Sequence, residues 1–133
     1  MCRRAIEPRL GTWTFPSGFM EMGETSGEGA ARETLEEARA VVAVDGLLAV
    51  ISVPQQSQLY LIHRARLVQP EHGPTPESLE VLLMREDEIP WGGIAFPTIY
   101  HSLKFFFADR ARGESAFHLL DLGRRQAVAQ DAA

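Results

Sequence analysis

The sequence lacks three features, and each absence narrows the class of protein: a pair of cysteines, an excess of basic residues, and a long apolar run. One cysteine, Cys2, excludes an internal disulfide and is typical of a reducing compartment. The 13 basic residues against 18 acidic ones give a net charge of -5, so nucleic acid is not the expected partner. No apolar run reaches transmembrane length, and the N-terminus has no signal-peptide hydrophobic region. We therefore expect a cytoplasmic protein with no membrane and no nucleic-acid partner.

What is present suffices for one globular core. The chain has 133 residues, of which 45% are hydrophobic and 23% are charged, and a chain of this length seldom holds two domains. We expect a single domain over residues 1–123 and a flexible tail over 124–133. Segments typical of strands cover 1–6, 11–16, 41–53, 58–67, 77–85 and 116–120, and helical patterns run from 28 onward and over 97–111. This order predicts the α/β class, with a mixed sheet and a helix on each face.

Three local patterns refine this prediction. The Asp45–Gly46 pair interrupts a β-branched run, which predicts two strand pieces that meet at a turn or a bulge. In the segment 58–67, Leu59 and Leu61 fall on an apolar face and Tyr60 falls on the opposite one. The Phe105–Phe107 run in the second helix has the spacing of core packing rather than of a cofactor site.

The most informative stretch is 18–40, GFMEMGETSGEGAARETLEEARA, which is rich in glutamate. Thr25 and Glu28 have the form of a capping box, so we expect a helix to begin there. An apolar stripe that packs on a sheet follows from the spacing of Ala31, Thr34, Leu35 and Ala38. On another face, the spacing i, i+3, i+4 brings together the carboxylates of Glu33, Glu36 and Glu37. Such a face is either a solvated acidic surface or a site where a divalent cation relieves the repulsion.

The residues that precede this helix favour the second interpretation. The spacing GX5EX7REUXEEXGU, in which U is a bulky aliphatic residue, is matched by Gly18, Glu24, Arg32, Glu33, Glu36 and Glu37. The stretch therefore resembles the box of the Nudix hydrolase family. Thr34 replaces the first aliphatic residue, Ala40 is a small version of the last, and Arg39 replaces the glycine. Because glycine just past a helix usually marks a left-handed residue, we expect Arg39 to be left-handed at a cost of about 1 kcal/mol.

The resemblance implies a small α/β/α sandwich that uses Mg²⁺ or Mn²⁺ to hydrolyse a diphosphate linkage. The metal ligands that it implies are Glu36, Glu37, Glu33 and the carbonyl of Ser17, and Glu33 is also a candidate general base. Arg32 would orient a carboxylate through its fork of donors. Family members often use a further acidic residue outside the box. The run 76–81, PESLEV, resembles such a segment, with Glu77 as the first choice for a distal ligand or base and Glu80 as the second.

The substrate that the resemblance implies is a nucleoside diphosphate derivative. The chain is most similar to the plastid FAD diphosphatase and its bacterial relatives, so FAD or ADP-ribose is the expected type. Substrate contacts are expected from Gly18, where the backbone approaches closely, from Glu24, and from Gln58 and Tyr60, with Tyr60 stacked on a base. The alternatives are a hydrolase of damaged nucleoside triphosphates and a non-catalytic nucleotide-binding or regulatory protein.

The N-terminal run CRRAIEPRLGTWTFPSGFMEMGE resembles the end of a first strand and the approach to the box in these relatives. We expect an incomplete first strand. Either the chain is a shortened form, or a second subunit covers the exposed edge in a homodimer.

Overall fold

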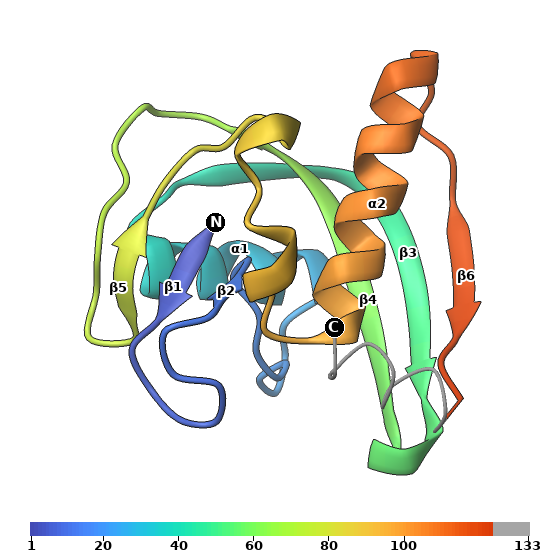
Figure 1. Cartoon of the computed structure of the whole chain (residues 1–133), viewed down its shortest axis with the longest axis horizontal. Coiled ribbons are helices and arrows are strands. Elements are labelled where there is room, and N and C mark those ends of the chain that lie inside the picture. Colours follow the sequence, from blue (N-terminus) through green and yellow to red (C-terminus); the bar gives the residue numbers. More distant parts are fainter. Residues whose placement is uncertain (124–133) are drawn as a thin grey trace.

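The computed structural model of the protein describes residues 1–123 as two small sheets with two α-helices (Figure 1). The strands are β1 (Cys2–Arg4), β2 (Trp13–Thr14), β3 (Val42–Val53), β4 (Gln58–Leu67), β5 (Ser78–Val81) and β6 (His118–Asp121). The helices are α1 (Ser26–Ala38) and α2 (Pro97–Arg112). The predicted tail, 124–133, lies outside the described residues. Neither helix in the described part is long and apolar enough to cross a membrane. The mixed α/β class predicted from the sequence is confirmed.

The first sheet has the order β2-β1-β5 and is antiparallel throughout. Met1 continues the pairing beyond β1, because Leu82 donates its N–H to the Met1 carbonyl at 2.9 Å and the terminal amine donates to the Leu82 carbonyl at 2.7 Å. The side chain of Cys2 is buried in a small cluster with Ala38 and Ala40. This cluster holds the first sheet against the C-terminal end of α1.

The second sheet has the order β4-β3-β6 and is mixed, since β4 runs antiparallel to β3 and β6 runs parallel to it. β3 is one strand of 12 residues with a bulge between Val44 and Gly46. The bulge that was predicted at Asp45–Gly46 is confirmed, and the prediction of two separate pieces is wrong. A second irregularity lies between Leu47 and Ala49. Bulges bend a strand and increase its twist, and Figure 1 shows β3 curving around α1 before it passes behind α2.

The two faces of β4 are the reverse of those that the alternation suggested. Leu59 and Leu61 are 62% and 40% exposed, whereas Ile62 is buried and Tyr60 packs against the same core cluster. The cause is α2, which brings Phe105 to the Tyr60 face of the strand. When both faces of a strand carry apolar residues, alternation does not tell which face a helix covers.

The helix α1 buries less of its predicted stripe than expected. Leu35 is 52% exposed, and the buried positions of the helix are Gly29 and Ala38. Small residues allow close packing: a Cβ placed on Gly27 would lie 3.6 Å from the side chain of Val44 on β3. The helix therefore packs on the sheet through its glycines and alanines, and the longer side chains of its other faces remain available.

The helix α2 is anchored by a buried carboxylate. Asp109 is fully buried and accepts hydrogen bonds from Arg64 of β4 and, at 2.8 Å, from Nε2 of His118 on β6. The second oxygen of Asp109 lies 3.5 Å from Arg112. The bonds from His118 and Arg64 hold the pKa of Asp109 below its usual value of 3.8. The ring of His118 also stacks on Phe105 with 4.2 Å between the ring centres. This network fixes α2 to both edge strands of the second sheet.

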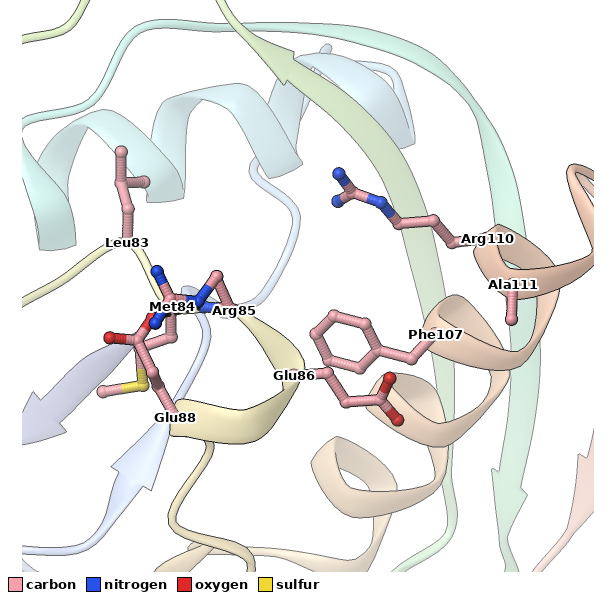
Figure 2. A pocket seen from close by; sticks show the side chains of 8 residues that line it. All are labelled: Leu83, Met84, Arg85, Glu86, Glu88, Phe107, Arg110 and Ala111. Atoms are coloured by element: carbon pink, nitrogen blue, oxygen red, sulfur yellow. Dashed lines mark hydrogen bonds and ion pairs between the residues drawn. The ribbon is translucent and has the colours of Figure 1, made fainter.

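An open hollow of about 730 Å³ lies between α2 and the segment that follows β5 (Figure 2). The strand predicted over 77–85 is shorter than expected, since β5 ends at Val81. Residues 83–88 therefore leave the sheet and lie across from the second half of α2. The hollow is lined by Leu83, Met84, Arg85, Glu86, Glu88, Phe107, Arg110 and Ala111.

Candidate active site

The acidic helix α1 has well-defined ends. At its start, Thr25 accepts a hydrogen bond from the Glu28 amide at 3.1 Å, and Glu28 accepts one from the Thr25 amide at 2.8 Å. This is the predicted capping box, and it satisfies two of the first amides of the helix. At its end, Arg39 has a φ of 54° and donates its N–H to the Leu35 carbonyl at 3.0 Å. The left-handed exit predicted at Arg39 is thus confirmed.

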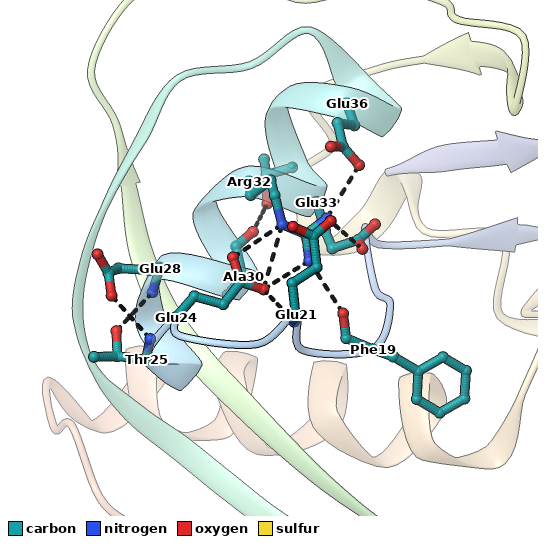
Figure 3. A network of polar contacts seen from close by, with 10 residues as sticks. Phe19, Glu21, Glu24, Thr25, Glu28, Ala30, Arg32, Glu33 and Glu36 are labelled. Carbon is teal, nitrogen blue, oxygen red and sulfur yellow. Dashed lines mark hydrogen bonds and ion pairs between the residues drawn. The ribbon is translucent and has the colours of Figure 1, made fainter.

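Arg32 lies at the centre of a network that joins α1 to the preceding loop (Figure 3). Its Nε donates to Glu24 at 3.0 Å and its Nη2 donates to the other oxygen of Glu24 at 2.8 Å. Its Nη1 donates to Glu33 at 2.9 Å and to Glu36 at 3.2 Å. The bonds from Arg32 lower the pKa of Glu24 to about 2. The carbonyl of Phe19 accepts a further bond at 3.1 Å, so this guanidinium holds the loop at both Phe19 and Glu24.

Gly18 and Glu33 are in close contact. A Cβ placed on Gly18 would lie 2.3 Å from the carboxylate of Glu33, a distance at which two heavy atoms overlap. Only glycine therefore leaves room for the Glu33 carboxylate at this position of the loop. The backbone of the loop and a carboxylate of α1 are thereby brought together, as metal sites with mixed carbonyl and carboxylate ligands require.

Glu37 is the carboxylate of α1 with the most unusual environment. Burial raises its pKa to about 7, although the Ser17 amide, which donates to Oε2 at 2.8 Å, opposes that rise. The nearby acidic groups of Glu33 and Glu77 contribute to the rise. Glu37 therefore lies within reach of the charges of two other acidic side chains, one on α1 and one on a separate segment. At Ser17 the contact comes from the amide, whereas the sequence pointed to the carbonyl.

Glu77 reaches this place because its loop is bonded to the end of α1. The Gly73 amide donates to the Ala38 carbonyl at 2.9 Å, and the hydroxyl of Thr75 donates to the Glu37 carbonyl at 3.1 Å. Thr75 also accepts from the Glu77 amide at 3.2 Å. Sequence reasoning missed Thr75, since a lone threonine in a proline-rich loop carries no signal of its own. The second choice, Glu80, instead faces Arg3 at 3.8 Å on an exposed surface.

Gln58 and Tyr60, the predicted substrate contacts on β4, lie apart from these carboxylates. The Tyr60 hydroxyl donates to the Gln58 side chain at 2.6 Å, and burial raises the pKa of Tyr60. Figure 1 shows the start of β4 at the end of the molecule opposite α1. The contact between β4 and α1 comes further along the strand, where His63 lies 3.1 Å from the hydroxyl of Ser26. Within residues 1–123, no hydrogen bond or ion pair joins Gln58 or Tyr60 to the α1 carboxylates.

Two of the three predicted metal-binding carboxylates of α1, Glu33 and Glu36, pair with Arg32. Across the described residues, no three acidic, histidine or cysteine side chains converge closely enough to hold a metal ion. The reason is visible in Figure 3, where Arg32 draws Glu33 and Glu36 toward its guanidinium. Rotation of these two side chains toward Glu37 would complete an oxygen-rich set of ligands. Such a set suits a hard divalent cation and phosphate chemistry.

Comparison with known proteins agrees with this geometry. A NUDIX domain matches residues 1–95, which include the loop, α1 and the Glu77 segment. The crystal structure of a NUDIX hydrolase from Nitrosomonas europaea shares 51% sequence identity and has a TM-score of 0.88, over 91% of this chain and 69% of that chain. A search of curated proteins gave no match. The chain therefore belongs to the NUDIX family and is a hydrolase of pyrophosphate linkages in nucleotide derivatives.

Proposed function

We propose that the chain is a Mg²⁺- or Mn²⁺-dependent hydrolase of a nucleoside diphosphate derivative, with FAD and ADP-ribose as the first substrates to test. The observation that carries this proposal is the contact of one loop with two carboxylates of α1: the Ser17 amide donates to Glu37 at 2.8 Å, and Gly18 lies against the carboxylate of Glu33. Negative charges in a partly buried place repel one another unless a cation shares them. The sequence resemblance to FAD and ADP-ribose diphosphatases supports the choice of substrate.

The donor atoms fit a hard divalent cation. We assign Glu33, Glu36 and Glu37 as its side-chain ligands, with the Ser17 carbonyl beside them. Carboxylate and carbonyl oxygens are the ligands that Mg²⁺ and Mn²⁺ prefer. When bound, the cation neutralises phosphate oxygens and lowers the pKa of the attacking water.

Arg32 holds the ligands in readiness. Its guanidinium contacts Glu33 and Glu36, but it also pairs with Glu24 and, at 3.4 Å, with Glu21. When Glu33 and Glu36 turn toward the cation, Arg32 keeps these two partners and is not left as an uncompensated charge. Glu24 therefore supports the site by holding Arg32, in addition to the substrate contact proposed for it.

Glu77 and Glu33 are the two candidates for the general base. Glu33 accepts a hydrogen bond from Arg32. Glu77 is exposed, and it contributes to the raised pKa of Glu37. Glu77→Gln should lower kcat, and Glu80→Gln provides a matched control, because Glu80 follows three positions later and has only an exposed ion pair. An unchanged kcat in Glu77→Gln assigns the base to Glu33.

Substrate contacts are proposed for Gly18 at the reacting end and for Gln58 and Tyr60 on β4. Tyr60→Phe removes the hydroxyl and keeps the ring, so it separates hydrogen bonding to Gln58 from stacking on a base. A raised KM in Tyr60→Phe with unchanged melting temperature supports contact with the substrate.

The test of the proposed function is a hydrolysis panel of FAD, ADP-ribose, NADH and deoxynucleoside triphosphates, each with Mg²⁺, with Mn²⁺ and with EDTA. We expect FAD or ADP-ribose to be cleaved fastest, and EDTA to abolish cleavage. A preference for triphosphates would favour the sanitising alternative, and binding without any hydrolysis would favour a regulatory role. Light scattering of the same preparation shows whether the chain forms a homodimer, one of the two alternatives for the exposed edge of the first sheet.

A further inference from the structure

We propose that the hollow between α2 and residues 83–88 binds the nucleobase end of the substrate, with an adenylate-like group as the ligand class. The proposal rests on the proposed function, because it assigns the part of that substrate that lies away from the scissile linkage. The volume of about 730 Å³ falls in the range of small-molecule sites. Three side chains on its walls support this assignment: the aromatic ring of Phe107 and the charged groups of Arg110 and Glu86.

Phe107 supplies a flat apolar wall that is held in place. Its ring makes edge-on contacts with Trp91, at 6.4 Å between ring centres, and with Phe106, at 5.3 Å. These contacts fix the orientation of the ring, and one of its sides remains part of the hollow (Figure 2). The sequence predicted core packing for the run Phe105–Phe107, and all three rings do pack against the core clusters, but Phe107 also lines the hollow. A rigid, partly exposed ring is the feature on which nucleobases stack.

Arg110 and Glu86 are charged side chains without partners in the part of the chain that the structure describes. Neither makes a side-chain hydrogen bond or an ion pair there, although both line the hollow. The other arginines nearby differ: Arg85 contacts Asp87 at 3.3 Å, and Arg112 contacts Asp109 at 3.5 Å. One donor group and one acceptor group therefore remain for a ligand.

The chemistry of these walls matches a nucleotide better than a simple anion. The Phe107 ring provides a surface for the base, and the carboxylate of Glu86 accepts from N–H donors such as an exocyclic amino group. The guanidinium of Arg110 suits a phosphate. Leu83, Met84 and Ala111 add an apolar lining around the ring. A free phosphate or a carboxylic acid would use only Arg110.

The hollow lies within reach of the candidate active site along one segment. Glu77 belongs to the carboxylate cluster, and Leu83, six residues later, lines the hollow. Six residues span at most about 20 Å when fully extended, a distance that an extended dinucleotide can bridge. The Gln58–Tyr60 pair is separate from the hollow, and a dinucleotide has two ends, so the hollow takes one of them.

The experiment measures binding of AMP, adenosine and ribose 5-phosphate by calorimetry to the full chain and to three variants. Phe107→Leu should weaken AMP and adenosine roughly tenfold, and Arg110→Gln should weaken AMP by a similar factor but leave adenosine unchanged. Arg112→Gln is the matched control, since Arg112 is on the same helix and does not line the hollow; its binding should equal wild type. Thermal melts show whether Phe107→Leu folds. If that variant does not fold, Arg110→Gln still tests the proposal, because Arg110 is exposed and its replacement should leave the fold intact.

Three results would overturn the assignment, and the first two are no binding of AMP to the wild-type chain and an AMP affinity that is the same in Arg110→Gln as in Arg112→Gln. Ribose 5-phosphate bound as tightly as AMP would also contradict it, because the base would then contribute nothing. Calorimetry measures binding without hydrolysis, so the binding proposal and the proposed function are tested by separate measurements. Hydrolysis without Arg110-dependent binding rejects the hollow, and Arg110-dependent binding without hydrolysis rejects the proposed function.

Discussion

Each of the two helices carries one charged side chain that is surrounded by charges of the opposite sign. The central charge is positive on α1 and negative on α2. On α1, the cation Arg32 is 21% exposed and has four carboxylates within 3.4 Å. On α2, the carboxylate of Asp109 is completely buried and has three basic side chains within 3.5 Å. The first group carries surplus negative charge and is open to solvent, whereas the second is closed by the protein itself.

The difference agrees with the proposed cation site on α1 and with the role of Asp109 as an anchor for α2. A closed network such as that of Asp109 has nothing to offer a ligand, and its value lies in holding α2 to β4 and β6. The α1 network has more carboxylates than Arg32 can neutralise, and Glu37 lies outside it with a pKa raised to about 7. This surplus of negative charge is what the proposed divalent cation would neutralise.

The most direct test of this difference removes one negative charge from the acidic group on α1. Glu37→Gln should lower kcat by about a hundredfold or more, since an amide is a poor replacement for a charged metal ligand. The fold should persist, because the variant loses repulsion with Glu33 and Glu77. Steady-state kinetics with Mg²⁺ and a thermal melt measure the two effects. Full activity of the wild type in the presence of chelator would sink this mechanism.

Removing the central charge of the anchor should instead affect stability. Asp109→Asn leaves Arg64 with a buried, unpaired charge, so the free energy of unfolding at pH 7 should fall clearly. The pKa of Asp109 is lowered in the fold, so its contribution is complete above its usual value of 3.8 and is lost as the pH falls through the lowered pKa. Stability of the wild type should therefore decline below about pH 4 more steeply than that of the variant. Urea unfolding at pH 7 and pH 3 measures this.

Asp87→Asn provides the control for that experiment. Asp87 pairs with Arg85 at 3.3 Å, but both side chains are about three-quarters exposed, and such pairs contribute little. Equal stability of Asp109→Asn and Asp87→Asn at pH 7 would show that the α2 network is not an anchor.

A smaller change sharpens the comparison on the α1 side. Gly18→Ala places a methyl group where the Glu33 carboxylate lies, so the Glu33 carboxylate must move away from Gly18. We expect activity to drop roughly tenfold with little loss of stability, because the loop is on the surface. Gly92→Ala is the control, since a Cβ there would meet nothing within 4 Å. Wild-type kinetics in Gly18→Ala would mean that Glu33 does not act from this position.

The smallest expected effect concerns the end of α1, outside either network. Arg39→Gly should stabilise the fold by about 1 kcal/mol, because a left-handed residue with a Cβ is strained. Ser57 has a similar φ of 52°, so Ser57→Gly should give a comparable gain far from the acidic helix. Chemical denaturation of both variants measures this. Destabilisation in both would show that the strain argument is wrong.

The sequence was most informative where the structure depends on neighbours a few residues away. The capping box of Thr25 and Glu28, the bulge near Gly46 and the left-handed exit at Arg39 all follow from local backbone and hydrogen-bonding rules. The fixed spacing of the box also led from Gly18 to the helix carboxylates, because the loop between them is short.

The sequence was least informative where distant segments meet. The buried face of β4 depends on the side from which α2 approaches. Leu59 and Tyr60 lie on opposite faces and either could be buried, so the strand itself does not show which face is covered. The strand expected over 77–85 stops at Val81 because the chain then crosses toward α2. Consequently neither the hollow nor the position of Arg110 has a local signature, since each arises from packing between elements far apart in the chain.

The loop that carries Glu77 has a consequence for how the site persists in time. The last carbonyls of a helix have no partners within it, and here the loop supplies them, through Gly73 to Ala38 and through Thr75 to Glu37. Detachment of the loop would leave these two carbonyls of α1 without caps, whereas Glu77 would still be held by its backbone, because its carbonyl accepts from the Ala5 amide at 3.0 Å. The order of the end of α1, which carries Glu37, should therefore follow the fraction of time that the loop stays attached. The hydrogen-exchange rate of the buried Gly73 amide reports that fraction directly.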